Sequence, residues 1–293
     1  MPRASSNGIE IEYEVFGPSD APPLLLVMGL GSQMIFWDEE FCEGLAARGH
    51  RVIRFDNRDV GRSTKLEAAG VPNVLAAMAA VGSGARVAAP YTLDDMADDA
   101  AGLLDALEVD AAHVVGASMG GMIAQTLAIR HPKRVRTLTS IMSTTGRPGL
   151  PGPTPAALGV LLAPPVAGRE PNVERGVATW RVIGSPGFPF DEPRIRERAG
   201  RAFDRGFHPE GVARQLAAIL ASGSRRERLA GVRAPTLVIH GQADPLVPVA
   251  CGVDTADAVP GAELLLVEGM GHDLPRGAWP TILDAIGKLT ARA

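Results

Sequence analysis

Seven short apolar runs, separated by turn residues, constrain the fold of this chain more than any other feature. The first run, residues 8–15, alternates apolar and polar side chains and predicts an antiparallel edge hairpin. The later runs are almost continuously apolar, which is typical of strands covered on both faces, as in a parallel sheet. These later runs span residues 23–28, 50–55, 112–116, 135–142, 236–240 and 263–267.

Helical patterns lie in several of the gaps between these runs. Thr92 and Asp95 form a capping-box-like start to a helix expected over residues 93–107. Two further helices are expected over 119–129 and 280–290, and the second of these has proline in its first turn. Strands that alternate with helices predict a doubly wound α/β fold with a mostly parallel sheet.

Residues 144–233 interrupt this alternation, because they contain no strand-like run. They open on a Pro- and Gly-rich stretch and continue with helical periodicity. The periodic stretches are 173–182, 193–203 and 212–220. We therefore expect a helical cap over 144–233, inserted into a core domain formed by 1–143 and 234–293. A disordered linker is the alternative, but the aromatic residues of this segment supply apolar area that disordered segments lack.

Charge and cysteine content exclude several classes of protein. A formal net charge of −4 provides no basic stripe for phosphates, so we expect a small molecule as partner, and neither nucleic acid nor a membrane surface. The most apolar stretches end well short of the roughly 20 residues of a membrane span, and the first residues do not resemble a secretory signal. Cys42 and Cys251 are far apart, which argues against a disulfide framework or a cysteine zinc site. We expect a cytoplasmic protein without a metal, and leave its oligomeric state open.

The sequence Gly116-Ala117-Ser118-Met119-Gly120 places a G-x-S-x-G pattern between a predicted strand and a predicted helix. A serine hydroxyl is a weak nucleophile unless a tight turn holds it clear of the sheet and beside a base. The two glycines permit such a turn, and the following helix directs its N-terminal amides at developing negative charge. A glycine-rich packing turn with an incidental serine is the alternative. In this context we expect Ser118 to be a catalytic nucleophile.

A nucleophilic serine needs a base, and His272 is the histidine best placed to act as one. It lies on a glycine-rich loop directly after the last predicted strand, at the sheet edge where ligands gather. Asp244 follows the preceding strand and is expected to orient the imidazole, in the chain order Ser, Asp, His. Asp244 also precedes Pro245, so a purely turn-forming role is the alternative. His50 and His113 begin predicted strands and are expected to be structural.

Acyl transfer at a serine also needs two amide donors for the oxyanion. The amide of Met119 is one by position, because it follows the nucleophile. The turn Gly29-Leu30-Gly31 follows the strand expected over 23–28, and we select the amide of Leu30 as the second donor. The alternative is a plain strand-ending turn.

Together these motifs resemble the α/β-hydrolase superfamily, from about Ile9 to the end of the chain apart from the variable cap. The stretch D-N-R-D-V-G-R-S at residues 56–63 resembles the D-x-R-G-x-G-x-S pattern of many members. The chain departs from the usual pattern at Asp59, where glycine is common, and at Met28, where many members have histidine.

Within the superfamily the chain is most similar to bacterial carboxylesterases, including the aclacinomycin methylesterase branch. The similarity is carried by V-M-G before the oxyanion turn, F-D-N-R-D after the next strand and G-x-S-M-G at the nucleophile. The resemblance implies ester hydrolysis through an acyl-enzyme without a cofactor. It also implies structural roles for Asp56 and Arg58.

The sequence therefore predicts a serine hydrolase of small-molecule carboxylic esters, with its pocket between sheet and cap. The residues that we assign to the pocket lining are Gly29, Met34, Phe36, Trp37, Met119, Trp180, Phe188, Leu246 and Met270. Similar triads also hydrolyse lactones, cleave carbon–carbon bonds or carry out perhydrolysis. Cleavage of a dienoate would need pocket cations, for which Arg62, Arg181 and Arg194 are available. A ligand receptor that keeps the fold is the non-enzymatic alternative.

Overall fold

A computed structural model describes residues 2–293 and places eight strands in one sheet of order β1-β2-β4-β3-β5-β6-β7-β8. β1 and β2 are antiparallel, β2 and β4 are antiparallel, and the remaining neighbouring pairs are parallel. The strands are β1 (Arg3–Ser6), β2 (Ile9–Phe16), β3 (Pro23–Val27), β4 (Arg51–Phe55), β5 (Ala112–Ala117), β6 (Val135–Ile141), β7 (Thr236–Gly241) and β8 (Glu263–Val267). The predicted α/β class with a mostly parallel sheet is confirmed.

The two edges of the sheet differ in how well the sequence pattern describes them. At one edge, β1 and β2 form the expected hairpin, whose turn residues Asn7 and Gly8 have positive φ angles of 48° and 78°. At the other edge, β8 was expected to be covered on both faces, but Leu264 and Leu266 are exposed. A continuous apolar run does not reveal whether both faces of its strand will be covered, because the covering segments come from distant parts of the chain.

Helices cover both faces of the sheet and create a core on each side. Alternate side chains of β3 point into opposite cores. Leu25 and Val27 pack with α3 and α4, whereas Leu24 and Leu26 pack with α1 and α11. The helices are α1 (Glu39–Ala46), α2 (Val74–Gly82), α3 (Leu93–Ala106), α4 (Met119–Arg130), α5 (Pro155–Leu161), α6 (Arg169–Ile183), α7 (Glu192–Gly206), α8 (Pro209–Ser222), α9 (Arg226–Leu229), α10 (Val249–Ala258) and α11 (Trp279–Thr290).

The observed helices match the strongest sequence patterns within a few residues. The helices expected over 93–107, 119–129 and 280–290 correspond to α3, α4 and α11. The side chain of Asp95 accepts a hydrogen bond from the backbone amide of Thr92 over 2.8 Å, as in the predicted capping box. α1, α2 and α10 have no counterpart in the prediction, because these short helices lack a long amphipathic repeat.

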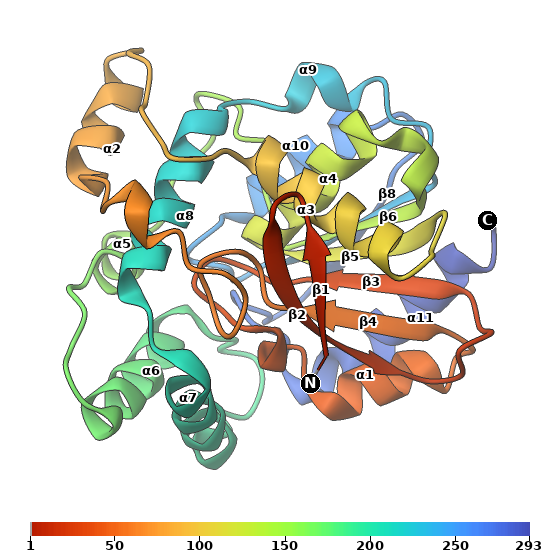
Figure 1. Ribbon diagram of the computed structural model, residues 1–293, viewed down its shortest axis with the longest axis horizontal. Coiled ribbons are helices and arrows are strands. Elements are labelled where there is room, and N and C mark those ends of the chain that lie inside the picture. The colour runs from red at the N-terminus through yellow and green to blue at the C-terminus, as the bar shows by residue number, and fades with distance from the viewer. Residues whose placement is uncertain (1) are drawn as a thin grey trace.

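The segment between β6 and β7 consists of the five helices α5 to α9 and contains no described strand. Figure 1 shows α6 and α7 standing apart from the sheet, with α5 and α8 between them and α2. We call residues 144–233 the inserted segment. Within the described part of the chain, no helix is long and apolar enough to cross a membrane.

Candidate active site

Ser118 occupies a sharp turn between β5 and α4. Its backbone angles, φ 55° and ψ −122°, are unfavourable for a residue with a side chain, and such conformations cluster at functional sites. The amide of Ser118 donates to the carbonyl of Ile141 on β6 over 2.9 Å. A Cβ atom at Gly116 would lie 2.1 Å from the carbonyl oxygen of Gly120. The glycines therefore allow the start of α4 to approach β5 closely enough to hold this turn.

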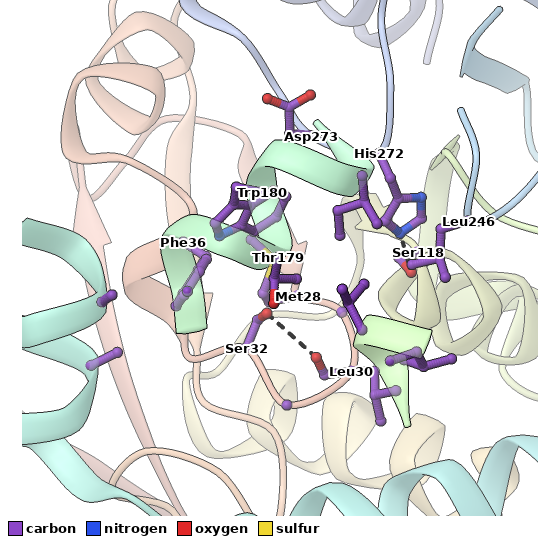
Figure 2. A pocket seen from close by; sticks show the side chains of 18 of the residues that line it. Met28, Leu30, Ser32, Phe36, Ser118, Thr179, Trp180, Leu246, His272 and Asp273 are labelled. Atoms are coloured by element: carbon purple, nitrogen blue, oxygen red, sulfur yellow. Dashed lines mark hydrogen bonds between the residues drawn. The ribbon is translucent and has the colours of Figure 1, made fainter. Parts of the chain in front are cut away.

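Three residues from separate loops meet at the turn. Oγ of Ser118 lies 2.9 Å from Nε2 of His272, and Nδ1 of His272 lies 2.7 Å from Oδ2 of Asp244. Figure 2 shows His272 directed at Ser118, with Leu246 beside them. His272 and Asp244 are each only 6% exposed, so little water competes for these contacts. In this arrangement the imidazole can accept a proton from the hydroxyl while the carboxylate accepts a hydrogen bond from Nδ1–H.

The carboxylate of Asp244 is oriented by the backbone of its own loop. Oδ1 accepts hydrogen bonds from the amides of Leu246 and Val247 over 2.9 and 2.8 Å. These two bonds leave Oδ2 directed at His272. The turn-forming role and the orienting role that the sequence suggested for Asp244 are therefore compatible, because each uses a different carboxylate oxygen.

The loop that carries His272 is held by the inserted segment. The amide of His272 donates to the carbonyl of Ile183 over 2.7 Å, and the Ser185 hydroxyl accepts from the amide of Gly271 over 2.9 Å. The same hydroxyl donates to Asp273, whose side chain points away from Ser118 and His272 in Figure 2. Burial raises the pKa of the Asp273 carboxyl, although the Ser185 hydroxyl acts in the opposite direction. Asp273 thus belongs to a contact between the His272 loop and the inserted segment, and not to the hydrogen-bonded row of Ser118, His272 and Asp244.

The two amides selected as oxyanion donors belong to the two turns that adjoin Ser118. Met119 is the first residue of α4, and Leu30 lies in the turn after β3. A Cβ atom at Gly29 would lie 3.2 Å from Cβ of Ser118, so this turn comes very close to Ser118. Among residues 2–293, neither amide donates to a protein acceptor. Both donors are therefore available to a ligand at Ser118.

A cavity of about 1170 Å³ opens at Ser118 and extends beneath the inserted segment. Its size slightly exceeds the roughly 300–1,000 Å³ that is usual for small-molecule sites. Phe36 and Trp180 form an aromatic wall with ring centroids 6.4 Å apart. The predicted residues that line the cavity are Gly29, Leu30, Phe36, Ser118, Met119, Trp180, Phe188, Leu246 and His272. This cavity can accommodate a ligand considerably larger than the ester group itself.

Met34, Trp37 and Met270 do not line the cavity, contrary to our expectation. All three are fully buried, and Trp37 stacks on Phe41 at a centroid distance of 5.7 Å. Met34 and Phe36 belong to one short 3-10 helix, and only Phe36 reaches the cavity. An apolar side chain near a site can face either core or pocket, and its residue type does not distinguish the two.

The cations around the cavity also differ from those that the sequence suggested. Arg194 lines the cavity, where it pairs with Asp38, whereas Arg62 and Arg181 do not line it. Arg198, which the sequence did not single out, lies over the rings of Phe36 and Trp180. The arginines that line the cavity are Arg175, Arg194, Arg198 and Arg276. Helical periodicity in α7 could have placed Arg194 and Arg198 on one face, because they are four residues apart.

Other polar residues have structural surroundings. His50 contacts Leu45 O and Thr290 Oγ1 through its two ring nitrogens, and His113 contacts Thr137 Oγ1. These contacts agree with the structural roles expected for both histidines. Within the described residues, no group of three or more His, Cys, Asp or Glu side chains is arranged to hold a metal ion.

In α/β hydrolases, a serine, a histidine and an aspartate lie on loops at the carboxyl ends of parallel strands, and the serine occupies a strand-to-helix turn. Ser118, His272 and Asp244 have this arrangement. The family model for the alpha/beta hydrolase fold matches residues 22–180, and this chain belongs to that family. A second family model, described as TAP-like protein, matches residues 220–283.

The chain is similar to proteins whose names describe ester or lactone hydrolysis. The chain is 36% identical over 292 residues to a rhodomycin D methylesterase of Streptomyces sp. strain C5, with 92% of this chain and 90% of that protein covered. It is 27% identical to 3-oxoadipate enol-lactonase 2 of Acinetobacter baylyi, with 85% and 81% covered. A solved structure described as an N-acyl homoserine lactone degrading enzyme has a TM-score of 0.71 and 26% identity, with 99% of each chain covered.

Proposed function

We propose that this protein is a serine carboxylesterase that works through an acyl-enzyme. The observation that supports this most strongly is the pair of contacts from Ser118 through His272 to Asp244, which open onto the cavity. The methylesterase relative acts on an ester, and the proposal transfers that reaction class to this chain.

In the first half-reaction, Oγ of Ser118 attacks the ester carbonyl carbon while Nε2 of His272 accepts the hydroxyl proton. The carbonyl oxygen becomes an oxyanion and accepts hydrogen bonds from the amides of Leu30 and Met119. Asp244 stabilises the resulting imidazolium through Nδ1–H. When the intermediate collapses, His272 returns the proton to the leaving alcohol, and an ester of Ser118 remains.

In the second half-reaction, water replaces the alcohol. Nε2 of His272 removes a proton from the water, whose oxygen attacks the acyl carbonyl. Collapse of this second tetrahedral intermediate breaks the bond to Oγ, and the imidazolium gives its proton back to Ser118. A carboxylic acid is released and the resting enzyme is restored. The same oxyanion donors serve both steps.

The substrate that we propose is a short-alcohol ester of a bulky, largely apolar acid. A cavity of about 1170 Å³ with an aromatic wall at Phe36 and Trp180 supports a large acyl group. We further propose that residues 144–233 act as a cap domain on a core of 1–143 and 234–293. The inserted segment contributes much of the cavity lining and contacts the loop of His272, which supports this division.

The test is hydrolysis of p-nitrophenyl acetate and butyrate by the wild type and by Ser118→Ala. We expect the variant to lose activity while its thermal midpoint stays within a few degrees, because one oxygen leaves a strained turn. An organophosphonate should label the wild type once, at Ser118, as peptide mass spectrometry would show. Substantial turnover by folded Ser118→Ala would rule out Ser118 as nucleophile.

Hydrolysis of a carbon–carbon bond in a dienoate is the second candidate. The arginines that line the cavity favour it, because such substrates carry carboxylates. However, the Arg194 guanidinium is already paired with Asp38. Loss of the dienoate chromophore on incubation with the wild type, with no turnover of p-nitrophenyl esters, would favour this candidate over the esterase.

A further inference from the structure

We propose that Gln215, on α8 of the inserted segment, is a positioning residue for the oxyanion loop, which we define as residues 28–31. The inserted segment would then contribute to the alignment of the catalytic groups in addition to covering the substrate. This inference rests on the proposed esterase function, in which the amide of Leu30 binds the oxyanion.

Gln215 is polar but fully buried, and both ends of its side-chain amide are bonded. Oε1 accepts from the backbone amide of Gly31 over 2.8 Å, and Nε2 donates to the backbone carbonyl of Arg58 over 2.8 Å. A buried amide of this kind leaves unsatisfied backbone groups behind when it is removed. One side chain of the inserted segment therefore connects two loops of the core.

The second of these loops is itself firmly held. Nε and Nη2 of Arg58 pair with the two carboxylate oxygens of Asp99 on α3, each over 2.6 Å. The next residue, Asp59, pairs in the same bidentate manner with Arg214, which precedes Gln215 on α8. α8 and the loop of Arg58 thus form a fixed support for Gln215.

The amide of Leu30 lies between two bonded backbone groups. On one side, Nδ2 of Asn57 donates to the carbonyl of Met28 over 2.8 Å. On the other side, Gly31 donates to Gln215. Because the Leu30 amide has no acceptor of its own among residues 2–293, its direction depends on these neighbouring bonds. Loss of the bond at Gly31 removes one of these two bonds, and the bond from the amide of Ser32 to the carbonyl of Gly29 over 3.2 Å is then the backbone contact that remains within the turn.

Misalignment of an oxyanion donor has a distinctive kinetic consequence. The donor is needed most when charge develops on the carbonyl oxygen, so the transition state loses more stabilisation than the bound ester. We therefore expect loss of the Gln215 bonds to lower kcat much more than it changes KM. A residue that only supported the fold would lower the amount of active protein instead.

The first experiment compares Gln215→Met with Gln125→Met, using a short-chain p-nitrophenyl ester. Gln125 is a matched control, because it is also fully buried and also bonded at both ends, to Ser140 and Arg225. We expect Gln215→Met to lower kcat at least tenfold with KM within threefold of wild type. Gln125→Met should lower the thermal midpoint, with kcat per folded molecule within threefold of wild type.

The second experiment uses Gln215→Glu, which keeps the size and shape of the side chain. A protonated Glu can still accept from Gly31 and donate to Arg58, whereas the carboxylate faces the Arg58 carbonyl without a proton to donate. Burial favours the neutral acid. We expect kcat of this variant to be near that of wild type at the acid end of the measurable range and to decline, relative to wild type, as pH rises.

Three outcomes would overturn the proposal. They are a kcat of folded Gln215→Met within threefold of wild type, an equal loss of kcat in the two methionine variants, and a pH profile of Gln215→Glu that superimposes on that of wild type. If Gln215→Met does not fold, the pH profile of Gln215→Glu decides alone.

The Ser118→Ala control separates this test from the proposed function. Turnover by Ser118→Ala refutes the esterase mechanism. Any of the three outcomes above, together with an inactive Ser118→Ala, refutes only the role of Gln215.

Discussion

At the scale of single residues, two aspartates near His272, the proposed base, have different surroundings. Asp273 adjoins His272 in sequence but bonds to Ser185 of the inserted segment. Asp244 is distant in sequence, yet its Oδ2 lies 2.7 Å from Nδ1 of His272. Adjacent side chains in an extended loop point apart, so the sequence neighbour is poorly placed to orient the ring.

This difference predicts unequal effects of the same substitution. Asp244→Asn should lower turnover on the scale of about ten-thousandfold, because an amide stabilises the wrong tautomer of the imidazole. Asp273→Asn should cost less than tenfold, since the amide oxygen can still accept the bond from Ser185. Turnover of a short-chain p-nitrophenyl ester at pH 8 measures both, with circular dichroism as the control for folding. A crippled Asp273→Asn beside a nearly normal Asp244→Asn would show that the acid has been misassigned.

At the scale of elements, glycines set how closely α4 approaches the neighbouring strands. A Cβ atom at Gly120 would lie 2.0 Å from the carbonyl oxygen of Val27 and 2.8 Å from that of Met28. α4 carries Ser118 at its start, and Met28 begins the oxyanion loop. The contact at Gly120 therefore controls both helix packing and the distance between Ser118 and the proposed oxyanion donor Leu30.

Gly120→Ala should accordingly lower both stability and activity. We expect a loss of about 1–3 kcal/mol in the free energy of unfolding, as is typical of overpacking, and at least a tenfold loss of esterase turnover. Gly159→Ala on α5 is the control, because a Cβ atom there meets nothing within 4 Å. That change should stabilise the protein by about 0.4–1 kcal/mol. Urea unfolding measures both, and equal stability of the two variants would contradict the packing argument.

At the scale of the whole molecule, buried histidines couple folding to pH. Burial, with the neighbouring His50 and Arg136 acting in the same direction, lowers the pKa of His113 to about 4. His113 is almost completely covered, and its ring meets that of His50 edge-on at 5.7 Å. Below its unfolded pKa of about 6.5, the unfolded chain binds a proton that the folded protein does not. Stability from this site is thus present above that value and is lost as pH falls toward 4.

The pH dependence predicts a specific effect of His113→Gln. The free energy of unfolding of the wild type should decline between pH 6.5 and pH 4, and the variant should show a smaller slope in this window because one proton-binding difference is gone. Glutamine can keep a hydrogen bond to Thr137. Urea unfolding at several pH values provides the slopes. Parallel curves for wild type and variant would mean that His113 does not contribute to acid unfolding.

The fold class and the proposed catalytic residues could be predicted from the sequence because their signals are local. Continuous apolar runs, helix periodicity and the G-x-S-x-G turn are each read within a short window, and chain order then leads to Asp244 and His272. Their meeting within hydrogen-bond distance follows from the topology, since the carboxyl ends of parallel strands share one edge of the sheet.

Tertiary structure alone decided which residues face the cavity and which residues hold the loops. Phe36 reaches the cavity while Met34 and Trp37 do not, because the direction of a side chain on a short irregular turn depends on what packs around it. Gln215 contacts Gly31 across 184 positions of sequence. No sequence pattern around Gln215 or Gly31 predicts this contact, because a hydrogen bond between distant segments forms only when the chain has folded.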